Sequence, residues 1–199
     1  MSSDEQIHRR GDAPGFARTK SRNDRRLVGR PEEKQGDHGG GGLGADRLAN
    51  AAAVTQLYGY PAIVVDFGTA VTFDVVSSAG DYVGGVIAPG LEAMTNFLYQ
   101  RTALLPKLTL REPTRAIGKT TRDAMMSGAV LGYRGLVREI FARLTAENFP
   151  RKKPRMIATG GYAQLIARRL PEIEAVHPNL TLEGLRLIAN RNTRPTGLP

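Results

Sequence analysis

The sequence lacks cysteine altogether, and this absence excludes disulfide bonds and thiolate metal centres. Its three histidines, His8, His38 and His177, have no ligand-like spacing, so a structural zinc site is not expected. No run of about 18 apolar residues occurs, and the polar N-terminus has no apolar core of a secretory signal. We therefore expect a cytoplasmic protein with no membrane partner.

The charge balance is strongly basic. The chain holds 28 Lys and Arg against 19 Asp and Glu, which gives a formal net charge of +9. Such a charge attracts polyanions, and both nucleic acids and ATP belong to this class. Because charges of both signs are spread along the chain, we interpret the excess as a solvated basic surface and expect no nucleic-acid partner.

The composition changes abruptly near residue 43. Residues 1–42 contain few apolar side chains, mix both charges and end in glycines, which predicts a disordered segment. Small and apolar residues dominate from Leu43, so we place the folded part at 43–192 and expect a frayed tail at 193–199. The length suits one ordinary domain, or one lobe of a larger fold with an appendage.

The folded part alternates helical and strand patterns. Two β-branched runs flank Gly80 and predict a hairpin, which joins the preceding strand in an antiparallel sheet. The longest helix has apolar residues at helical spacing from Tyr133 to Leu144, and Thr120 with Asp123 suits a capping box at its start. This stripe fits either the core or a subunit interface. The predicted strands are 62–66, 70–76, 82–88 and 155–159, and the predicted helices are 46–57, 91–101, 121–144, 162–170 and 182–190.

The segment DFGTA follows the first predicted strand and suits phosphate binding. Gly68 lets backbone N–H groups approach phosphate oxygens, and Thr69 adds a hydroxyl donor. Asp66, at the end of the strand, can hold a cation beside that phosphate. The alternative interpretation is an ordinary turn after a strand that ends in aspartate.

The segment ATGGY follows the last predicted strand. Gly160 and Gly161 stand where a strand leads into a helix, and free N–H groups at a helix start favour phosphate or ribose contacts. A tight turn would explain the same glycine pair. The segment gains weight because it follows DFGTA in the order that a nucleotide-binding lobe requires.

The segment LGADRLAN opens the first predicted helix. Asp46 can accept a hydroxyl proton while Arg47 holds an anionic group, which is a combination that suits a kinase site. Asp46 could instead serve as the N-cap of the helix. Capping alone gives no role to Arg47.

The order of these elements indicates the fold class. A strand, DFGTA, two further strands, a helix, a strand, a glycine pair and a helix follow one another as in one ribonuclease-H-like lobe of the actin-like ATPase superfamily. We therefore predict an α/β protein with a mixed sheet and flanking helices. Proteins of this class hold the nucleotide between two such lobes.

Several segments together resemble the type III pantothenate kinases. These bacterial enzymes phosphorylate pantothenate with ATP to give 4'-phosphopantothenate in the first step of coenzyme A biosynthesis. The matching segments occur in the family's order and approximate spacing: GADRLANAAA (44–53), VVDFGTAVTFDVV (64–76), GGVIAPGL (84–91), RTALLPKL (101–108), IGKTTRDAMMSGAVLGYRGLV (117–137), ATGG (158–161) and PNLTLEGLRLIANRN (178–192).

The resemblance implies roles for single residues on the substrate side. Asp46 matches the base that activates the pantothenate hydroxyl. Gly44, Ala45 and Arg47 lie in the segment that touches pantothenate, and Thr121 matches a threonine that contacts it. The family is dimeric and its substrate pocket includes residues of the partner subunit, so the resemblance also implies a homodimer.

The resemblance also implies a nucleotide and cation site. Asp66 matches the ligand of the monovalent cation, potassium or ammonium, that the family requires, and Mg²⁺ is expected with ATP. Thr69 matches a contact to the nucleotide phosphates beside Gly68. Gly160 and Gly161 fall in the stretch near the adenosine.

The sequence departs from the family in its N-terminal part. Family members begin with a strand that carries a DxGNT-type phosphate loop and builds the other lobe, but no D-x-G-N or D-x-G-T occurs here before Asp66. We interpret the change at Leu43 as a shifted start, an altered reading frame or a gene fragment. Because one lobe cannot enclose ATP, we expect little or no kinase activity from this chain alone.

Three alternatives stay open at this point. The chain could be a non-catalytic relative that acts as an accessory factor in transcription. It could be another sugar- or acetate-kinase-like ATPase of the same fold class, because a fold does not fix a substrate. It could also be a structural fragment that folds only with a partner lobe.

Overall fold

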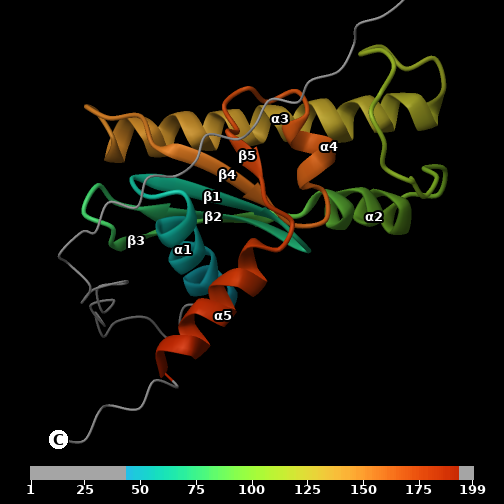
Figure 1. The fold of residues 1–199 in the computed structure, drawn as a ribbon. Coiled ribbons are helices and arrows are strands. Elements are labelled where there is room, and N and C mark those ends of the chain that lie inside the picture. The colour runs from blue at the N-terminus through green and yellow to red at the C-terminus, as the bar shows by residue number, and fades with distance from the viewer. Residues whose placement is uncertain (1–43, 193–199) are drawn as a thin grey trace, which may run out of the picture.

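The computed structural model describes residues 44–192, which form one mixed sheet with helices on both of its faces (Figure 1). The predictions for residues 1–42 and 193–199 lie outside the described residues. Within 44–192, no helix combines the length and apolarity that a membrane crossing needs.

The sheet has five strands in the order β3-β2-β1-β4-β5. β1, β2 and β3 pair antiparallel, whereas β4 pairs parallel to β1, and β5 pairs parallel to β4. This arrangement confirms the predicted hairpin and the mixed sheet of a ribonuclease-H-like lobe. The strands are β1 (Ala62–Phe67), β2 (Ala70–Val76), β3 (Tyr82–Pro89), β4 (Arg155–Thr159) and β5 (Ala175–Val176).

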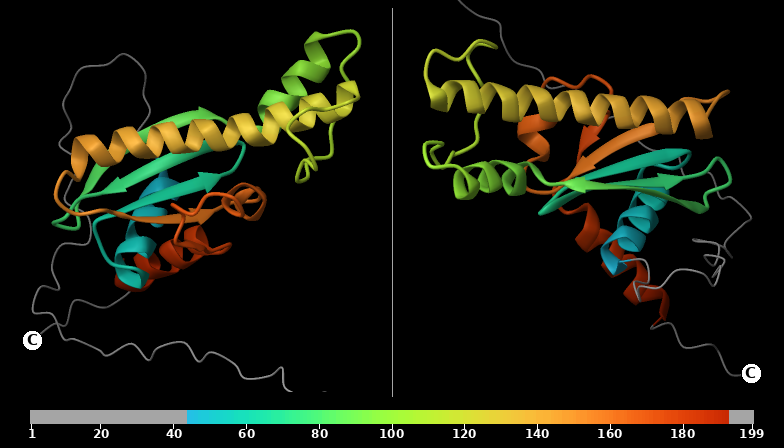
Figure 2. Two further views of the ribbon diagram at one scale, coloured as in Figure 1. Left: turned by 90° about the horizontal axis from the view of Figure 1, so that it is seen from above. Right: turned by 180° about the vertical axis from the view of Figure 1, so that it is seen from behind.

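Two layers of helices bury the central strand from both sides. α3 (Thr121–Asn148) and α4 (Ala163–Ala167) cover one face, and α1 (Ala45–Leu57) and α5 (Leu180–Asn192) cover the other (Figures 1 and 2). Because side chains alternate along a strand, Ile63, Val65 and Phe67 pack into the α3 layer, while Ala62 and Val64 pack against α1 and α5. This two-sided burial explains the continuous apolar run of β1.

The apolar stripe of α3 belongs to the core. Tyr133, Val137 and Phe141 are 1%, 1% and 6% exposed, and they pack against the sheet. At the start of the helix, the Thr120 hydroxyl accepts a hydrogen bond from the Asp123 N–H at 3.1 Å and donates one to the Asp123 carboxylate at 2.8 Å. The predicted cap is therefore confirmed, and the stripe is settled as core packing.

Several boundaries differ from the predictions. α3 continues to Asn148 instead of ending at 144, and α1, β1 and β3 each differ by one residue at one end. The helix predicted at 162–170 is confined to α4, because Pro171 cannot continue a helix and the preceding residues form a turn. The last helix begins earlier than predicted, at the fully buried Leu180. β5 was not predicted, since a two-residue strand has no pattern of its own.

A buried arginine connects α3 to two other segments. Arg134 is 4% exposed, and its guanidinium donates to both carboxylate oxygens of Glu112 at 2.9 and 2.6 Å. It also donates to the backbone oxygens of Leu165 and Ile166 in α4 at 2.7 and 3.1 Å. A buried charge is tolerated when it is paired in this way, and the contact fixes the connection that follows α2 (Leu91–Arg101).

α1 and α5 approach each other closely where both carry small side chains. A Cβ atom on Gly184 of α5 would overlap the backbone oxygen of Ala49 in α1. Ala49 and Ala53 are fully buried in this contact layer. Glycine at position 184 therefore sets the distance between the two helices.

Gly184→Ala should destabilise the protein by about 1–3 kcal/mol, because the added methyl group forces α5 away from α1. Gly135→Ala is the matched control, since a Cβ atom there meets nothing within 4 Å. That control should stabilise α3 by about 0.5–1 kcal/mol, the usual preference of a helix for alanine. Urea denaturation measures both effects, and a shift of both midpoints in the same direction would contradict this packing.

Candidate active site

The GADR segment places Asp46 in the first turn of α1, where its side chain is exposed. The helix starts after Gly44, which offers no side-chain cap. The Asp46 carboxylate accepts a hydrogen bond from the Arg47 backbone N–H at 3.0 Å. Asp46 is therefore not the N-cap residue, and a carboxylate oxygen stays available at the surface.

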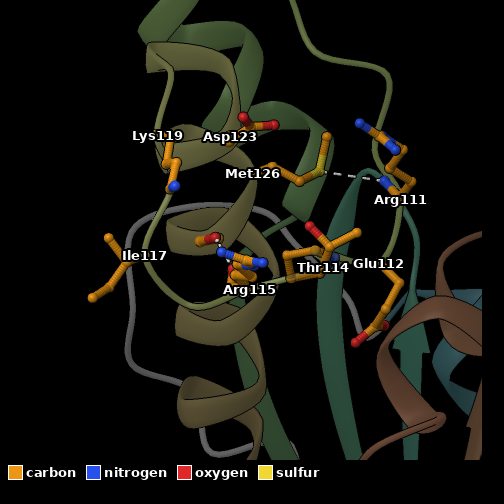
Figure 3. Close-up of a pocket in the computed structure, with 11 residues that line it drawn as sticks. Arg111, Glu112, Thr114, Arg115, Ile117, Lys119, Asp123 and Met126 are labelled. Carbon is orange, nitrogen blue, oxygen red and sulfur yellow. Dashed lines mark hydrogen bonds between the residues drawn. The ribbon is translucent and has the colours of Figure 1, made fainter.

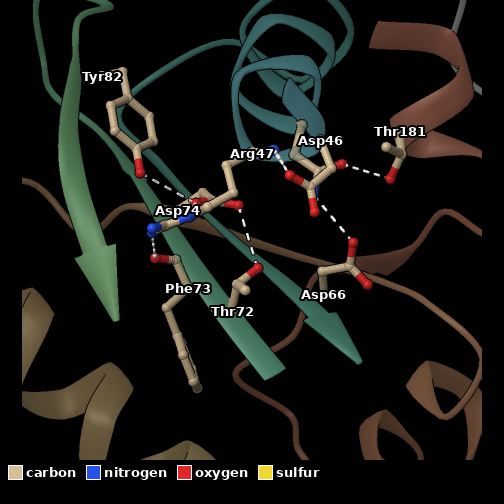
Figure 4. Close-up of polar contacts among 9 residues, drawn as sticks. Asp46, Arg47, Asp66, Thr72, Phe73, Asp74, Tyr82 and Thr181 are labelled. Carbon is tan, nitrogen blue, oxygen red and sulfur yellow. Dashed lines mark hydrogen bonds and ion pairs between the residues drawn. The ribbon is translucent and has the colours of Figure 1, made fainter. Parts of the chain in front are cut away.

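Asp66 lies at the end of β1, under the start of α1 (Figure 4). Its carboxylate accepts a hydrogen bond from the Asn50 amide at 3.2 Å, and the Asn50 carbonyl accepts one from the Thr181 hydroxyl at 2.8 Å. Burial raises the pKa of Asp66; the Asn50 amide opposes this shift and the Asp46 charge adds to it. Asp46 and Asp66, the two predicted site carboxylates, therefore lie at the same junction of α1 with the end of β1 (Figure 4).

A second carboxylate, Asp74, lies fully buried in the middle of β2. It accepts the Arg47 Nε–H at 2.7 Å and the Tyr82 hydroxyl at 3.3 Å (Figure 4). Burial raises the pKa of Asp74, and the contact with Arg47 opposes that shift. Burial together with the Asp74 charge raises the pKa of Tyr82 to about 12.

Within this network Arg47 is largely buried, whereas its neighbour Asp46 is exposed. The Arg47 side chain turns toward Asp74 and Tyr82, and its Nη2 donates to the Phe73 backbone oxygen at 3.4 Å (Figure 4). Only 13% of the side chain is exposed. Most of the guanidinium is thus committed to the sheet.

The two predicted phosphate segments meet at one cleft. Gly68, Thr69 and Gly161 line a cleft of about 320 Å³ together with Glu92 and Tyr162. A volume of this size lies at the lower end of the range for small-molecule pockets. Segments that are distant in the sequence therefore share one surface, as the predicted nucleotide site requires.

Gly160 allows the ATGGY segment to approach the DFGTA segment. Its φ of +91° favours glycine, and a Cβ atom there would lie 2.5 Å from the Asp66 carboxylate and 2.6 Å from the Phe67 backbone. The Tyr162 N–H donates to the Phe67 oxygen at 3.4 Å. ATGGY is consequently pressed against DFGTA.

Thr121 lies apart from the other predicted residues of this chain. It is the first residue of α3, which begins beside α2 at one end of the molecule and runs along the face opposite to α1 (Figures 1 and 2). A pocket of about 330 Å³ lies beside the start of α3. Its lining includes Arg111, Arg115 and Lys119 as well as Glu112 and Asp123 (Figure 3). One chain therefore does not bring Thr121 to Asp46.

Several residues of this network were not predicted. Asn50, Asp74, Tyr82 and Thr181 carry no motif of their own. A signal was present for two of them, because Asn50 interrupts an alanine-rich helix and Asp74 interrupts a β-branched strand. A polar residue at a buried position requires a partner, and that partner is visible only in the fold.

The carboxylates form no closed metal site in the described part of the chain. Within residues 44–192, no group of three or more His, Cys, Asp and Glu side chains could hold a metal ion. Asp66 offers one carboxylate at the junction of α1, β1 and the Gly160 turn. It can contribute a ligand to a cation but does not enclose one.

Arg47→Met should make the stability of the protein more dependent on pH. Asp74 stays buried in this variant but loses the hydrogen bond and the charge that oppose the rise of its pKa. The stability that such a group contributes is complete below its unfolded pKa of about 4 and is lost as the pH rises through the raised folded pKa. We expect a loss of about 3 kcal/mol near pH 7 and a smaller loss near pH 4.5, measured by urea denaturation.

The double variant Arg47→Met with Asp74→Asn is the control for this effect. It removes the buried carboxylate, so the added pH dependence should disappear. An equal loss for Arg47→Met at both pH values would show that Asp74 is not the group responsible.

The family model and the curated relatives agree on one family. Residues 40–143 match the family model for type III pantothenate kinase. The chain is 57% identical over 150 residues to a type III pantothenate kinase of Akkermansia muciniphila, covering 75% of this chain and 61% of that protein. It is 52% identical over 158 residues to the one of Acidiphilium cryptum, covering 79% and 58%.

A solved structure supports the fold. A crystal structure from Campylobacter jejuni, assigned to the Baf family of transcriptional activators, matches with a TM-score of 0.55 at 24% identity. It covers 78% of this chain and 68% of that chain. This likeness shows the fold alone.

The match covers only part of the length of each relative. The chain spans 61% and 58% of the two curated relatives described above. The family model nevertheless covers more than half of this chain, and its match contains GADR, DFGTA and KTT. The chain belongs to the type III pantothenate kinase family.

Proposed function

We propose that this chain takes part in the ATP-dependent phosphorylation of pantothenate to 4'-phosphopantothenate, the first step of coenzyme A biosynthesis. The observation that carries the proposal is the position of Asp46. Its exposed carboxylate stands in the first turn of α1, beside the end of β1 where Asp66 lies (Figure 4). Asp66 in turn touches the Gly160 turn that borders the predicted nucleotide cleft.

Asp46 would act as the base toward the pantothenate hydroxyl. Phosphoryl transfer passes through a loose transition state, so a carboxylate in the right position contributes more than a strong base would. Its hydrogen bond to the Arg47 backbone N–H holds it at the helix start, and exposure leaves the substrate free to approach. Gly44, Ala45 and Arg47 would form the adjoining pantothenate surface.

ATP would lie along the cleft between DFGTA and ATGG. Gly68 and Thr69 would contact the phosphates, and Gly160 and Gly161 would border the adenosine. The space beside Gly161 supports this, because a Cβ atom there would meet nothing within 4 Å. ATP would bring Mg²⁺ with it, because this ion is usually held by substrate phosphates together with one or two carboxylates.

A monovalent cation, potassium or ammonium, would bind at Asp66. Asn50 donates to only one of the two oxygens of that carboxylate, so the other can serve as a cation ligand. A positive charge here would offset the cost of burying Asp66 and the effect of Asp46 on it. The remaining ligands would come from backbone oxygens and from the nucleotide.

A homodimer would bring Thr121 to the substrate. Asp46 lies in the first turn of α1 and Thr121 begins α3, and these two helices cover opposite faces of the sheet (Figure 1). A single pantothenate could therefore touch both residues only if they came from two subunits. The surface near Thr121 supports such an interface. Large apolar side chains are exposed on α2, on the connection after it and on α3, namely Phe97, Leu98, Tyr99, Leu104, Ile117 and Leu131.

A role as an accessory factor in transcription is the alternative function. The likeness to the Campylobacter structure is too distant to support it, because it carries the fold alone. The net charge of +9 permits nucleic-acid binding but does not single it out. No contact among the described residues favours this role over the kinase.

A chimeric enzyme tests whether these residues can support catalysis. Residues 44–192 would replace the matching region of the Akkermansia relative, so that an N-terminal part of known family origin accompanies them. The chimera should release ADP in the presence of pantothenate, ATP, Mg²⁺ and K⁺. Asp46→Asn should lower its kcat by about 10²–10⁴, the usual contribution of a general base.

Asp81→Asn is the matched control for Asp46→Asn, because it makes the same change in the β2–β3 turn. It should leave kcat unchanged. An inactive chimera, or one whose turnover survives Asp46→Asn, would overturn the proposed function.

Sedimentation velocity tests the homodimer. The chain should sediment as a dimer, and Ile117→Asp should yield monomers because it buries an unpaired charge in the interface. Leu182→Asp is the control, since Leu182 is 64% exposed on α5 and Ile117 is 83% exposed near α3. A chain that sediments as a monomer at all concentrations would contradict this proposal.

A further inference from the structure

The start of α1 lacks the usual means of fixing a helix end. Gly44 precedes the helix and provides no side-chain cap, and Ala45 has no polar side chain. Asp46 bonds only to the backbone of its neighbour among the contacts of the described residues. This hydrogen bond stays within the turn, so a link from the turn to the sheet has to come from another residue.

Arg47 supplies a connection from this turn to the sheet. Its Nε–H donates to the Asp74 carboxylate at 2.7 Å, and its Nη2 donates to the Phe73 oxygen at 3.4 Å. Both acceptors belong to the central part of β2, which is fully buried at these positions. The first turn of the helix is thereby attached to a rigid strand.

The surroundings of the guanidinium are shaped to receive it. A Cβ atom on Gly85 of β3 would lie 2.5 Å from Arg47 Nη2, so glycine leaves the space that the guanidinium occupies. The Tyr82 ring lies 5.9 Å from the guanidinium carbon, and the Tyr82 hydroxyl donates to Asp74. Thr72 donates to the second Asp74 oxygen at 3.5 Å.

Stability alone does not account for this arrangement. The attraction within a buried ion pair barely offsets the desolvation of both charges, and an apolar pair of similar size commonly stabilises a protein as well or better. A buried charged pair also fixes the relative orientation of the two elements that carry it, because its hydrogen bonds require one geometry. The geometry fixed here is that of the α1 start.

We propose that Asp74 is a positioning residue that acts through Arg47 to hold the first turn of α1, and with it the Asp46 carboxylate, over the end of β1. What Asp46 does there rests on the proposed function. Arg47 is then chiefly a link between helix and sheet, and its role toward a substrate anion is secondary. The same link explains why Arg47 accompanies Asp46 in the GADR segment.

Asp74→Asn in the full chain tests this role, because it keeps the shape of the side chain and removes its charge. Two NMR signals report on the link. The Arg47 Nε–H resonance should exchange slowly with water in the unmodified chain and rapidly in the variant. The amides of Leu48 and Ala49 should exchange about tenfold faster in the variant, while amides of Val54 and of α5 keep their rates.

Asp81→Asn again serves as the control and should change none of these rates. Tyr82→Phe is a milder variant that keeps both charges, and it should speed the same two amides by a smaller factor. Unchanged rates in Asp74→Asn would overturn the proposal. Equal acceleration throughout α1 and α5 would overturn it too, because that pattern reports general destabilisation.

The chimeric enzyme adds a catalytic readout. Asp74→Asn should lower kcat about tenfold and leave the KM for ATP unchanged, because a misplaced base slows the chemical step. Adding Asp74→Asn to Arg47→Met should cause no further loss, since both act on one link. Independent, additive losses of kcat in the double variant would overturn the proposal. If the unmodified chimera were inactive, the kinase function would be contradicted, and the amide-exchange rates would decide the positioning role.

Discussion

The parallel pairing of β1 with β4 is the constraint on which the site depends. Its register sets Asp66 beside Thr159, so the next residue, Gly160, falls directly against the Asp66 carboxylate and the Phe67 backbone. No side chain fits between them. DFGTA and ATGG therefore form one continuous surface, and the cleft beside Gly68 and Gly161 follows from this contact. β1 can serve in this way because helices bury it on both faces and hold its end in place.

Most of the fold could be predicted because its elements carry strong local patterns. β2 and α2 have the predicted bounds, and the apolar spacing around Tyr133 identified α3. The failures occurred where tertiary contacts decide the structure. β5 exists only because β4 offers a partner edge, and α5 begins at Leu180 because that side chain is buried beneath α1.

The candidate site was predictable only in its motifs. Gly68, Thr69 and Gly161 could be predicted because glycine and hydroxyl residues at strand ends indicate phosphate binding. The structure places all three in the lining of one cleft. The residues that support the site could not be predicted from the sequence. Thr181 meets Asn50 across 131 positions of sequence, and this contact depends on how closely α5 packs on α1. No local pattern encodes a distance of that kind.

The two parts of the site are held by different physical means, and this difference determines how each responds to substitution. Backbone contacts hold the proposed nucleotide side, where Gly160 lies against β1, so a larger side chain there disturbs the sheet itself. A side-chain ion pair between α1 and β2 holds the proposed substrate side. Changes to Asp74 can therefore move the start of α1 while the strands keep their register. The proposed nucleotide side thus depends on the strand pairing itself, whereas the position of Asp46 depends on one ion pair.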